Sequence, residues 1–256
     1  MNIIQGKLNF FSLFKRNFLY RLKSKINIDN HPDFKEKSID DLFSYYNCDK
    51  ANFINEGKNK SHGYSKFYEK HFHSLKNKKI NILEIGSFAG ASAASFAKYF
   101  PNATIYCLDI NLTNFKFISK NMKIFGLDVS KKRMIRKFYQ KINISHETEY
   151  FDIIIDDGSH KLSNIIISLN TFFRNLTPGG FYVLEEFKFP NYYPHQYDCS
   201  ENKIDEILNC LKNKKKFSSN ILNDEMIQYL LKFTDDIFQY RGLLNDSDIS
   251  FIKKLN

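Results

Sequence analysis

Two adjacent carboxylates and an imidazole follow a run of apolar residues in the middle of the chain. Residues 151–155 are mainly β-branched and apolar and predict a strand buried on both faces, after which come Asp156, Asp157 and His160. In open α/β sheets ligands bind at such strand ends. Carboxylates can hold a hard cation and an imidazole can act as a base, so we expect a metal and acid–base site here. The alternative is that Asp156 caps the next helix while Asp157 and His160 are solvated.

A second acidic pair follows another candidate strand. Residues 181–184 predict a strand, and Glu185 and Glu186 come directly after it. Because neighbouring parallel strands bring their carboxyl ends together, Asp157, Glu185 and Glu186 could converge on one point. Three carboxylates that close would repel one another unless a divalent cation lay between them, and all-oxygen ligands favour Mg²⁺. The alternative is that the two glutamates only edge a solvent-filled cleft.

A glycine turn earlier in the chain indicates a nucleotide-binding half. A buried-type strand at residues 80–85 leads through Gly86 and Gly90 into a helix at residues 92–100. The dinucleotide fingerprint G-x-G-x-x-G is incomplete, because its second glycine is absent. The next strand ends in Asp109, whose carboxylate could accept the hydroxyls of a ribose. Two strand ends therefore point at one nucleoside-like ligand.

The remaining patterns supply the elements that position these residues. We expect further strands at residues 104–109 and 122–127, helices at residues 38–46, 130–142, 162–176 and 202–216, a helix through residues 68 and 72, a turn at residues 177–180, and a terminal hairpin of residues 236–240 and 249–252. Alternation of strands and helices predicts an α/β fold, a doubly wound, mainly parallel Rossmann-like sheet with a C-terminal antiparallel hairpin. An aromatic loop at residues 187–197 could form one wall for a hydroxylated substrate or be an ordinary packed loop.

Composition bounds the class of protein. The 256 residues are 43% hydrophobic, which suits one large domain or one domain with an arm. The four cysteines are scattered without a CxxC pair, so neither a zinc site nor a disulfide framework is indicated, and a reducing, cytoplasmic setting fits best. His71 and His73 lie two apart and would point to different sides of a helix, so we expect surface residues rather than a metal pair.

The charge of the chain is strongly positive, but it does not identify a partner. Much of the formal +10 is lysine spread among asparagine and isoleucine, so we interpret it mainly as solvated surface and expect no specific nucleic-acid partner. No stretch is long and apolar enough to span a bilayer. We expect a protein that is soluble or at most rests on a surface.

The first forty residues form a separate segment by pattern. Residues 8–25 interleave phenylalanine and leucine with lysine and arginine at the spacing of a basic amphipathic helix, and residues 31–37 read as a linker. We expect a helical N-terminal extension at residues 1–40 and one domain at residues 41–256. Packing of the helix on its own domain or on a neighbouring subunit is favoured, which leaves a homo-oligomer open. Contact with an anionic membrane is the less favoured alternative.

These residues together carry a resemblance to a known family. Leu83-Glu84-Ile85-Gly86 with Gly90, Asp109 after the second strand, and the closing hairpin resemble a class I S-adenosylmethionine-dependent methyltransferase. The narrower resemblance is to the macrocin and mycinamicin type of sugar O-methyltransferase, and it covers about residues 45 to 255. It rests on Asp156-Asp157-Gly158-Ser159-His160, Pro178-Gly179-Gly180, Glu185-Glu186, Asp49-Lys50 and His62-Gly63-Tyr64.

The resemblance implies roles for individual residues. It makes Asp157, Glu185 and Glu186 the Mg²⁺ ligands, and it makes His160 the general base. The residues that would line the S-adenosylmethionine site are Tyr64, Glu84, Gly86, Ser87, Gly90, Asp109, Asp128 and Asp156. The family usually has Glu-Asp where this chain has Glu185-Glu186, and the polar residue usual after Asp128 is Val129 here.

The activity that the resemblance implies is a methyl transfer. S-adenosylmethionine would donate the methyl group, Mg²⁺ would assist, and the acceptor would be a hydroxyl of a sugar or glycan precursor. Two alternatives remain open. One is a metal-dependent methyltransferase that acts on a catechol or an antibiotic nucleus, and the other is a non-catalytic sugar- or anion-binding protein of the same fold.

Overall fold

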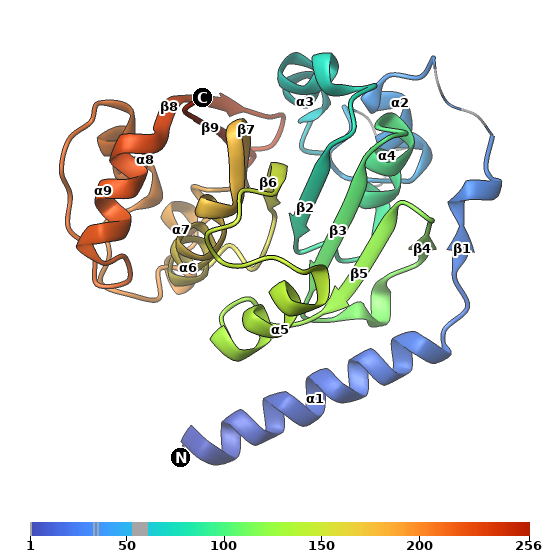
Figure 1. Cartoon of the computed structure of the whole chain (residues 1–256), viewed down its shortest axis with the longest axis horizontal. Helices are drawn as coiled ribbons and strands as arrows, with labels where there is room; N and C mark the ends of the chain where they lie inside the picture. Colours follow the sequence, from blue (N-terminus) through green and yellow to red (C-terminus); the bar gives the residue numbers. More distant parts are fainter. Residues whose placement is uncertain (1, 33, 35, 53–60) are drawn as a thin grey trace.

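The central sheet of the protein is mixed and mainly parallel. The computed structural model describes residues 2–32, 34, 36–52 and 61–256, with side chains from residue 11 onward. Within these residues the strands of the sheet are β2 (Asn81–Ile85), β3 (Thr104–Asp109), β5 (Met122–Gly126), β6 (Phe151–Asp156), β7 (Leu176–Glu185), β8 (Thr234–Arg241) and β9 (Asp248–Lys254). Their order is β5-β3-β2-β6-β7-β9-β8, and β9 runs opposite to the other six strands, so that its pairs with β7 and β8 are antiparallel (Figure 1). The predicted sheet and its terminal hairpin are confirmed.

Helices cover both faces of this sheet. One face packs against α2 (Ile39–Tyr45), α3 (Ser65–Phe72) and α4 (Ala91–Tyr99), and the other against α5 (Lys132–Ile142), α6 (Leu162–Phe172), α8 (Ile204–Lys212) and α9 (Asp224–Phe233). Strand β6 contributes side chains to the hydrophobic core on each face of the sheet. Ile153 and Ile155 pack on the face covered by α2, α3 and α4, and Ile154 packs on the opposite face. A strand buried on both faces needs the continuous apolar run that the sequence has here.

Several elements differ from their predicted bounds. Helix α9 is absent from the sequence prediction, although Asn223 caps it by accepting a hydrogen bond from the Met226 N–H and apolar residues line its buried side. The predicted turn at residues 177–180 lies inside β7, where the register against β6 shifts between Phe151 and Ile153. The aromatic loop contains the short helix α7 (Phe189–Tyr192). His71 is half-buried and stacks on the ring of Phe251 at 4.4 Å, so its predicted surface position is wrong.

Helix α1 (Asn2–Leu22) lies apart from the two helical layers, below the sheet in Figure 1. It contacts the ends of β3 and β5: Asn17 donates to the Gly126 carbonyl and Arg16 to the Ile110 carbonyl. After it, β1 (Ile26–Asn27) pairs in parallel with β4 (Phe117–Ile118). In the part of the chain that the structure describes, every helix is too short or too polar to cross a bilayer.

Candidate active site

The acidic residues meet because β6 and β7 are neighbours in register. Asp156 of β6 pairs with Leu184 of β7, so the next residues lie side by side: Asp157 directly after β6 and Glu185 at the last position of β7. The N–H of Asp157 donates to the Ile85 carbonyl at 2.9 Å, which fixes the strand end against β2. The carboxyl edge of the central parallel strands therefore carries the predicted cluster.

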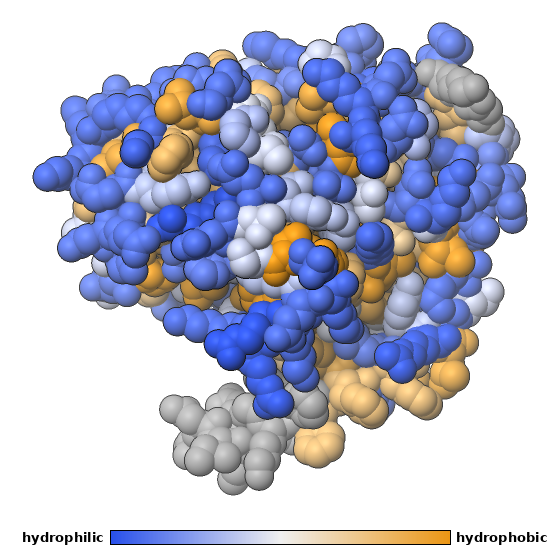
Figure 2. All heavy atoms as spheres, viewed as in Figure 1, coloured by the Kyte–Doolittle hydropathy of each residue, from blue (hydrophilic) through white to orange (hydrophobic). Residues whose placement is uncertain are grey.

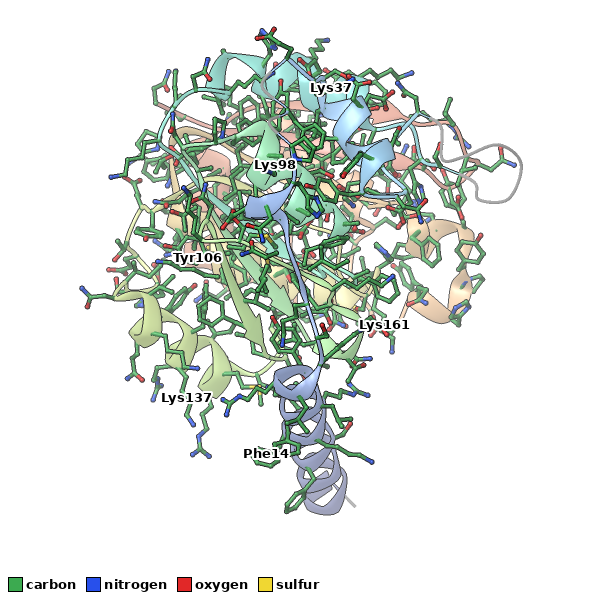
Figure 3. All side chains as sticks on the ribbon, turned by 90° about the vertical axis from the view of Figure 1, so that its right-hand side faces the viewer. Phe14, Lys37, Lys98, Tyr106, Lys137 and Lys161 are labelled. Carbon is green, nitrogen blue, oxygen red and sulfur yellow. The ribbon has the colours of Figure 1, made fainter. Side chains whose placement is uncertain are left out.

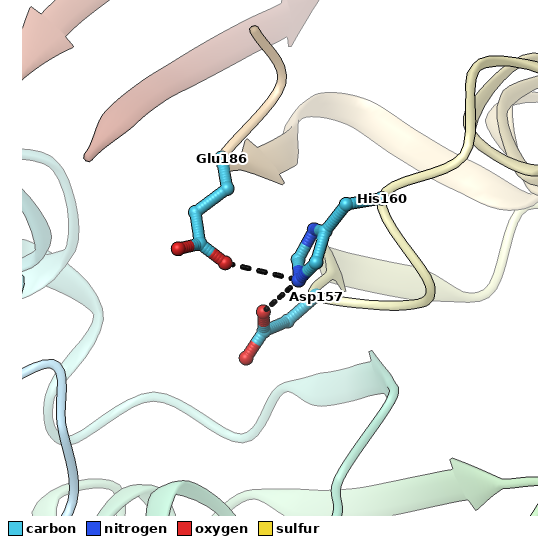
Figure 4. Close-up of side chains that lie close together, drawn as sticks. All are labelled: Asp157, His160 and Glu186. Atoms are coloured by element: carbon cyan, nitrogen blue, oxygen red, sulfur yellow. Dashed lines mark ion pairs between the residues drawn. The ribbon is translucent and has the colours of Figure 1, made fainter. Parts of the chain in front are cut away.

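Asp157, His160 and Glu186 form the centre of this cluster (Figure 4). His160 Nε2 lies 2.9 Å from Glu186 Oε2 and 3.7 Å from Asp157 Oδ1. One ligand atom from each of the three residues lies within 4.8 Å of the others, the arrangement of a candidate metal site. His160 and Glu186 have φ of 52° and 50°, a left-handed conformation that non-glycine residues adopt at an energetic cost. The backbone is therefore locally strained at the two residues whose side chains meet in the cluster.

Glu185 faces a different set of partners. Its Oε2 accepts from Lys50 Nζ at 2.6 Å, and its Oε1 accepts a short hydrogen bond from the Tyr68 hydroxyl. The same Lys50 ammonium lies 2.5 Å from Asp157 Oδ2, and the lysine side chain is 2% exposed. Lys50 is therefore a buried cation that joins two of the three predicted metal ligands. The sequence prediction of site residues did not include Lys50, although the Asp49-Lys50 pair was part of the resemblance.

His62 is a second residue that the site prediction left out. Its Nε2 lies 3.4 Å from Glu186 Oε1, and its Nδ1 is 2.7 Å from the Ser247 hydroxyl in the turn of the terminal hairpin. The Leu243 N–H donates to the His62 carbonyl, which ties the same hairpin to this segment. The signal that could have found His62 is its place in the His62-Gly63-Tyr64 motif.

The charges of the cluster explain the pKa values of its members. Burial alone would lower the pKa of His160, but the hydrogen bond to Glu186 and the charge of Asp157 outweigh it and raise this pKa to about 9. Burial would also lower the pKa of Lys50, and the charges of Asp157 and Glu185 raise it instead, so the lysine stays charged. When Asp157, Glu185 and Glu186 are all ionised, three carboxylates against one ammonium leave two negative charges, and burial opposes that state because it raises the pKa of Asp157 and raises that of Glu185 to about 8. Protonated imidazole or a divalent cation can balance them, so the donor set fits a hard divalent ion.

Two predicted cofactor residues carry buried polar atoms that lack a partner within the described residues. These atoms are Glu84 Oε2 and the hydroxyl oxygen of Tyr64. Glu84 is fully buried and its other oxygen accepts from the Ser92 hydroxyl, while Tyr64 stacks on His62 with ring centroids 5.2 Å apart. A buried group without a hydrogen bond is costly, so each atom suits a polar ligand group. A cofactor that carries an amine and a second polar group would give both Glu84 Oε2 and the Tyr64 hydroxyl a hydrogen-bond partner.

The glycine turn has a packing reason for each of its glycines. A Cβ on Gly86 would lie 2.0 Å from the Asp157 carbonyl oxygen, and one on Gly90 would lie 2.7 Å from the ring of Phe115. Both glycines have positive φ, and Gly90 is the N-cap of α4. Ser87 is buried beside them. Gly86 thus lets the turn after β2 lie close to the end of β6, and Gly90 leaves room for the Phe115 ring, whether or not a ligand binds.

The other predicted cofactor residues hold loops in place. Asp109 accepts from the N–H groups of Phe88 and Asn111, and Asp128 accepts from the N–H and hydroxyl of Ser130. Asp156 is buried, which raises its pKa to about 7. Asp109 and Asp128 thus lie at successive strand ends, as a nucleoside site needs, while Asp156 lies beneath the surface of the cluster.

Aromatic side chains from α7 border the cluster on one side. The ring of Phe189 lies 5.3 Å from that of His160, and the ring of Tyr193 lies 4.2 Å from that of Phe189. The hydroxyls of Tyr192 and Tyr193 donate to Asp248 and Asp246 of the hairpin. This segment is therefore anchored at its polar tips and presents ring faces near His160.

Comparisons with known proteins give a consistent result. No family model matches the chain. Over 173 residues, 62% of this chain and 38% of the relative, it is 28% identical to mycinamicin VI 2''-O-methyltransferase of Micromonospora griseorubida. Over 144 residues, 52% of this chain and 34% of the relative, it is 31% identical to L-olivosyl-oleandolide 3-O-methyltransferase of Streptomyces antibioticus. The chain thus spans between a third and two fifths of the length of these relatives.

A solved structure gives the same result for the fold. The MycE methyltransferase from the mycinamycin biosynthetic pathway, in complex with Mg and SAH, superposes with a TM-score of 0.65 at 22% identity, over 88% of this chain and 56% of that chain. The fold is that of the class I methyltransferases. In sequence the chain is related to sugar O-methyltransferases of the macrocin and mycinamicin type.

Proposed function

We propose that this protein transfers a methyl group from S-adenosylmethionine to a hydroxyl of a sugar or glycan precursor, with Mg²⁺ as a cofactor. The observation that carries the proposal is the cluster of Asp157, His160 and Glu186, whose ligand atoms lie within 4.8 Å of one another at the carboxyl edge of the sheet. A relative that acts on a sugar hydroxyl and a fold neighbour that contains Mg and SAH support it.

In this proposal the acidic residues hold the cation. Asp157, Glu185 and Glu186 would be its ligands, and the ion would compete with Lys50 for Asp157 and Glu185, because the ammonium already contacts both carboxylates. A bound Mg²⁺ lowers the pKa of a hydroxyl that would otherwise be too weak an acid to react at neutral pH. Lys50 and Tyr68 keep Glu185 fixed and its charge balanced before the ion arrives.

His160 is the proposed general base. Its Nε2 lies at the centre of the cluster and must be unprotonated to accept the hydroxyl proton of the acceptor. The contact with Glu186 raises the pKa of His160 to about 9, so the imidazole carries a proton at neutral pH as long as that contact persists. If Glu186 bound the cation instead of His160, the pKa of His160 would fall, and the imidazole would lose its proton and be able to act as a base. Proton removal and occupation of the acidic site are then coupled.

Residues on the other strand ends would bind the cofactor. Glu84 Oε2 offers a buried acceptor for an ammonium group, and the Tyr64 hydroxyl offers a buried donor beside the cluster. Asp109 would accept the ribose hydroxyls, and Asp128 would lie near the adenine. S-adenosylmethionine supplies the methyl group, and these residues hold it in line with the attacking oxygen.

The ring faces of α7 are the proposed wall for the acceptor. Phe189 lies next to His160 and Tyr193 lies next to Phe189, and both rings would pack against the apolar face of a sugar ring. Because the Tyr193 hydroxyl already donates to Asp246, the rings are held in position rather than free to turn.

The test is turnover together with cofactor binding. Methyl transfer from labelled S-adenosylmethionine to glycosylated macrolides is measured for the wild type, His160→Ala and the surface control His146→Ala, whose imidazole is 72% exposed. We expect His160→Ala to abolish turnover. Its affinity for S-adenosylmethionine, measured by calorimetry, should stay within a few fold of the wild type. The control His146→Ala should behave as the wild type in both assays. Near-normal rates for His160→Ala would remove this residue from the mechanism.

Two further outcomes would point to the alternatives. Turnover of catechols but not of sugars would show that the ring faces of Phe189 and Tyr193 serve an aromatic acceptor. Binding of sugar without any binding of S-adenosylmethionine or Mg²⁺ would favour the non-catalytic binding protein.

A further inference from the structure

Helix α1 presents large apolar side chains to solvent. Phe14, Phe18 and Leu22 recur every four residues and so share one face of the helix, and they are 64%, 51% and 70% exposed. Leu19 beside them is 44% exposed. In Figure 2, pale orange apolar side chains lie along the lower rim of the molecule, where α1 runs. A contiguous apolar surface of this kind on a soluble domain marks an interaction site.

A different face of the helix fixes its orientation. Leu13, Asn17 and Tyr20 recur at helical spacing on the side toward the sheet: Leu13 is buried, Asn17 Nδ2 donates to the Gly126 carbonyl at 2.9 Å, and Tyr20 packs edge-on against Phe115. Since this face is occupied, the apolar face with Phe14 is turned away from the domain. Figure 3 shows α1 projecting below the body of the protein, with Phe14 on it.

The charges beside the apolar face have one sign. Residues 1–28 contain six lysines and arginines and no aspartate or glutamate, and the first acid of the chain is Asp29. Lys15 and Arg21 lie on the exposed part of α1. Within the described residues, no carboxylate forms an ion pair with the cations of α1. An apolar stripe flanked by cations alone matches the acyl and headgroup layers of an anionic lipid surface.

We propose that helix α1 docks this protein on an anionic membrane surface, lying in the plane of the interface with Phe14, Phe18, Leu19 and Leu22 toward the acyl chains. Pairing of α1 with α1 of a second copy would bring cations against cations without an acid to balance them. Because α1 contacts the ends of β3 and β5, docking would turn the carboxyl edge of the sheet toward the surface.

The test is binding of the full chain to lipid vesicles. Sedimentation is measured with vesicles of phosphatidylcholine alone and of phosphatidylcholine mixed with phosphatidylglycerol. We expect binding only to the anionic vesicles, and weaker binding as salt is raised. The double variant Phe14→Ser/Phe18→Ser should lower the partition coefficient at least about tenfold, and Lys15→Gln/Arg21→Gln by a similar factor. The matched control Lys215→Gln/Lys216→Gln, which removes two exposed charges outside α1, should bind as the wild type.

Several results would overturn the inference. The wild type could stay in the supernatant with anionic vesicles, bind neutral vesicles equally well, or bind no better than the phenylalanine variant. Light scattering gives a further check: a wild-type dimer that becomes a monomer in Phe14→Ser/Phe18→Ser would assign this face to a second copy instead. Circular dichroism melting of each variant confirms that it is folded, because these side chains are exposed and their loss should not unfold the domain.

Discussion

Binding of a divalent cation should depend steeply on the proton of His160. The imidazole and the ion would share Glu186 and Asp157, so the proton must leave when the ion binds. With a pKa of about 9, His160 is protonated in all but about one molecule in a hundred at pH 7. Release of this proton should therefore lower the apparent Kd for Mg²⁺ about ninefold from pH 7 to pH 8, about fiftyfold by pH 9 and about one hundredfold well above pH 9.

Calorimetry measures both the affinity and the proton. Titrations of Mg²⁺ into the protein at several pH values, each in buffers of different ionisation heat, give the Kd and the number of protons released. The variant His160→Gln keeps a hydrogen-bonding side chain but has no proton to release in this range. We expect it to bind Mg²⁺ more tightly than the wild type at pH 7 and to lose the part of the pH dependence that comes from His160, while the part set by Glu185, whose pKa burial raises to about 8, remains. The reasoning is refuted if wild type and variant show the same pH profile.

The same pKa predicts how stability changes with pH in the absence of metal. Because folding raises the pKa of His160 from 6.5 to about 9, this group stabilises the fold fully below pH 6.5. That contribution, about 3 kcal/mol at most, is lost as the pH rises through 9. Urea unfolding of wild type and His160→Gln across this range measures the difference, which should disappear above pH 9.

Other predictions concern the buried lysine and the glycine turn. Lys50→Met leaves Asp157 and Glu185 without their cation, so the metal-free variant should lose about 3 to 5 kcal/mol in urea unfolding and recover part of it in Mg²⁺. A variant that is destabilised equally with and without Mg²⁺ would mean that the ion does not share these carboxylates. Gly86→Ala places a Cβ 2.0 Å from the Asp157 carbonyl oxygen and should cost more than about 2 kcal/mol, whereas Gly158→Ala, with its nearest contact at 3.0 Å, should cost less. Equal effects on the two melting curves would contradict the packing account of the turn.

The sequence by itself determined the layers of the fold. Short apolar runs such as residues 153–155 favour strands buried on both faces of a sheet, and the helical spacings between them favour parallel strands. Acidic residues directly after two such runs were enough to predict that Asp157 and Glu185 would lie close together. Helix α9 was missed because its apolar pattern is short and it follows a stretch rich in serine and asparagine.

Only the tertiary structure decided how the charges of the site are balanced. Lys50 and His62 lie more than ninety residues from Asp157 in sequence, and no local pattern states that a lysine will be buried between two carboxylates. Their positions follow from the packing of α3 and the terminal hairpin over the sheet edge. The orientation of α1 is decided in the same way, since the sequence gives an amphipathic helix but not which face is covered. Periodicity is a local property of the chain, whereas the burial of a charge depends on contacts between distant segments.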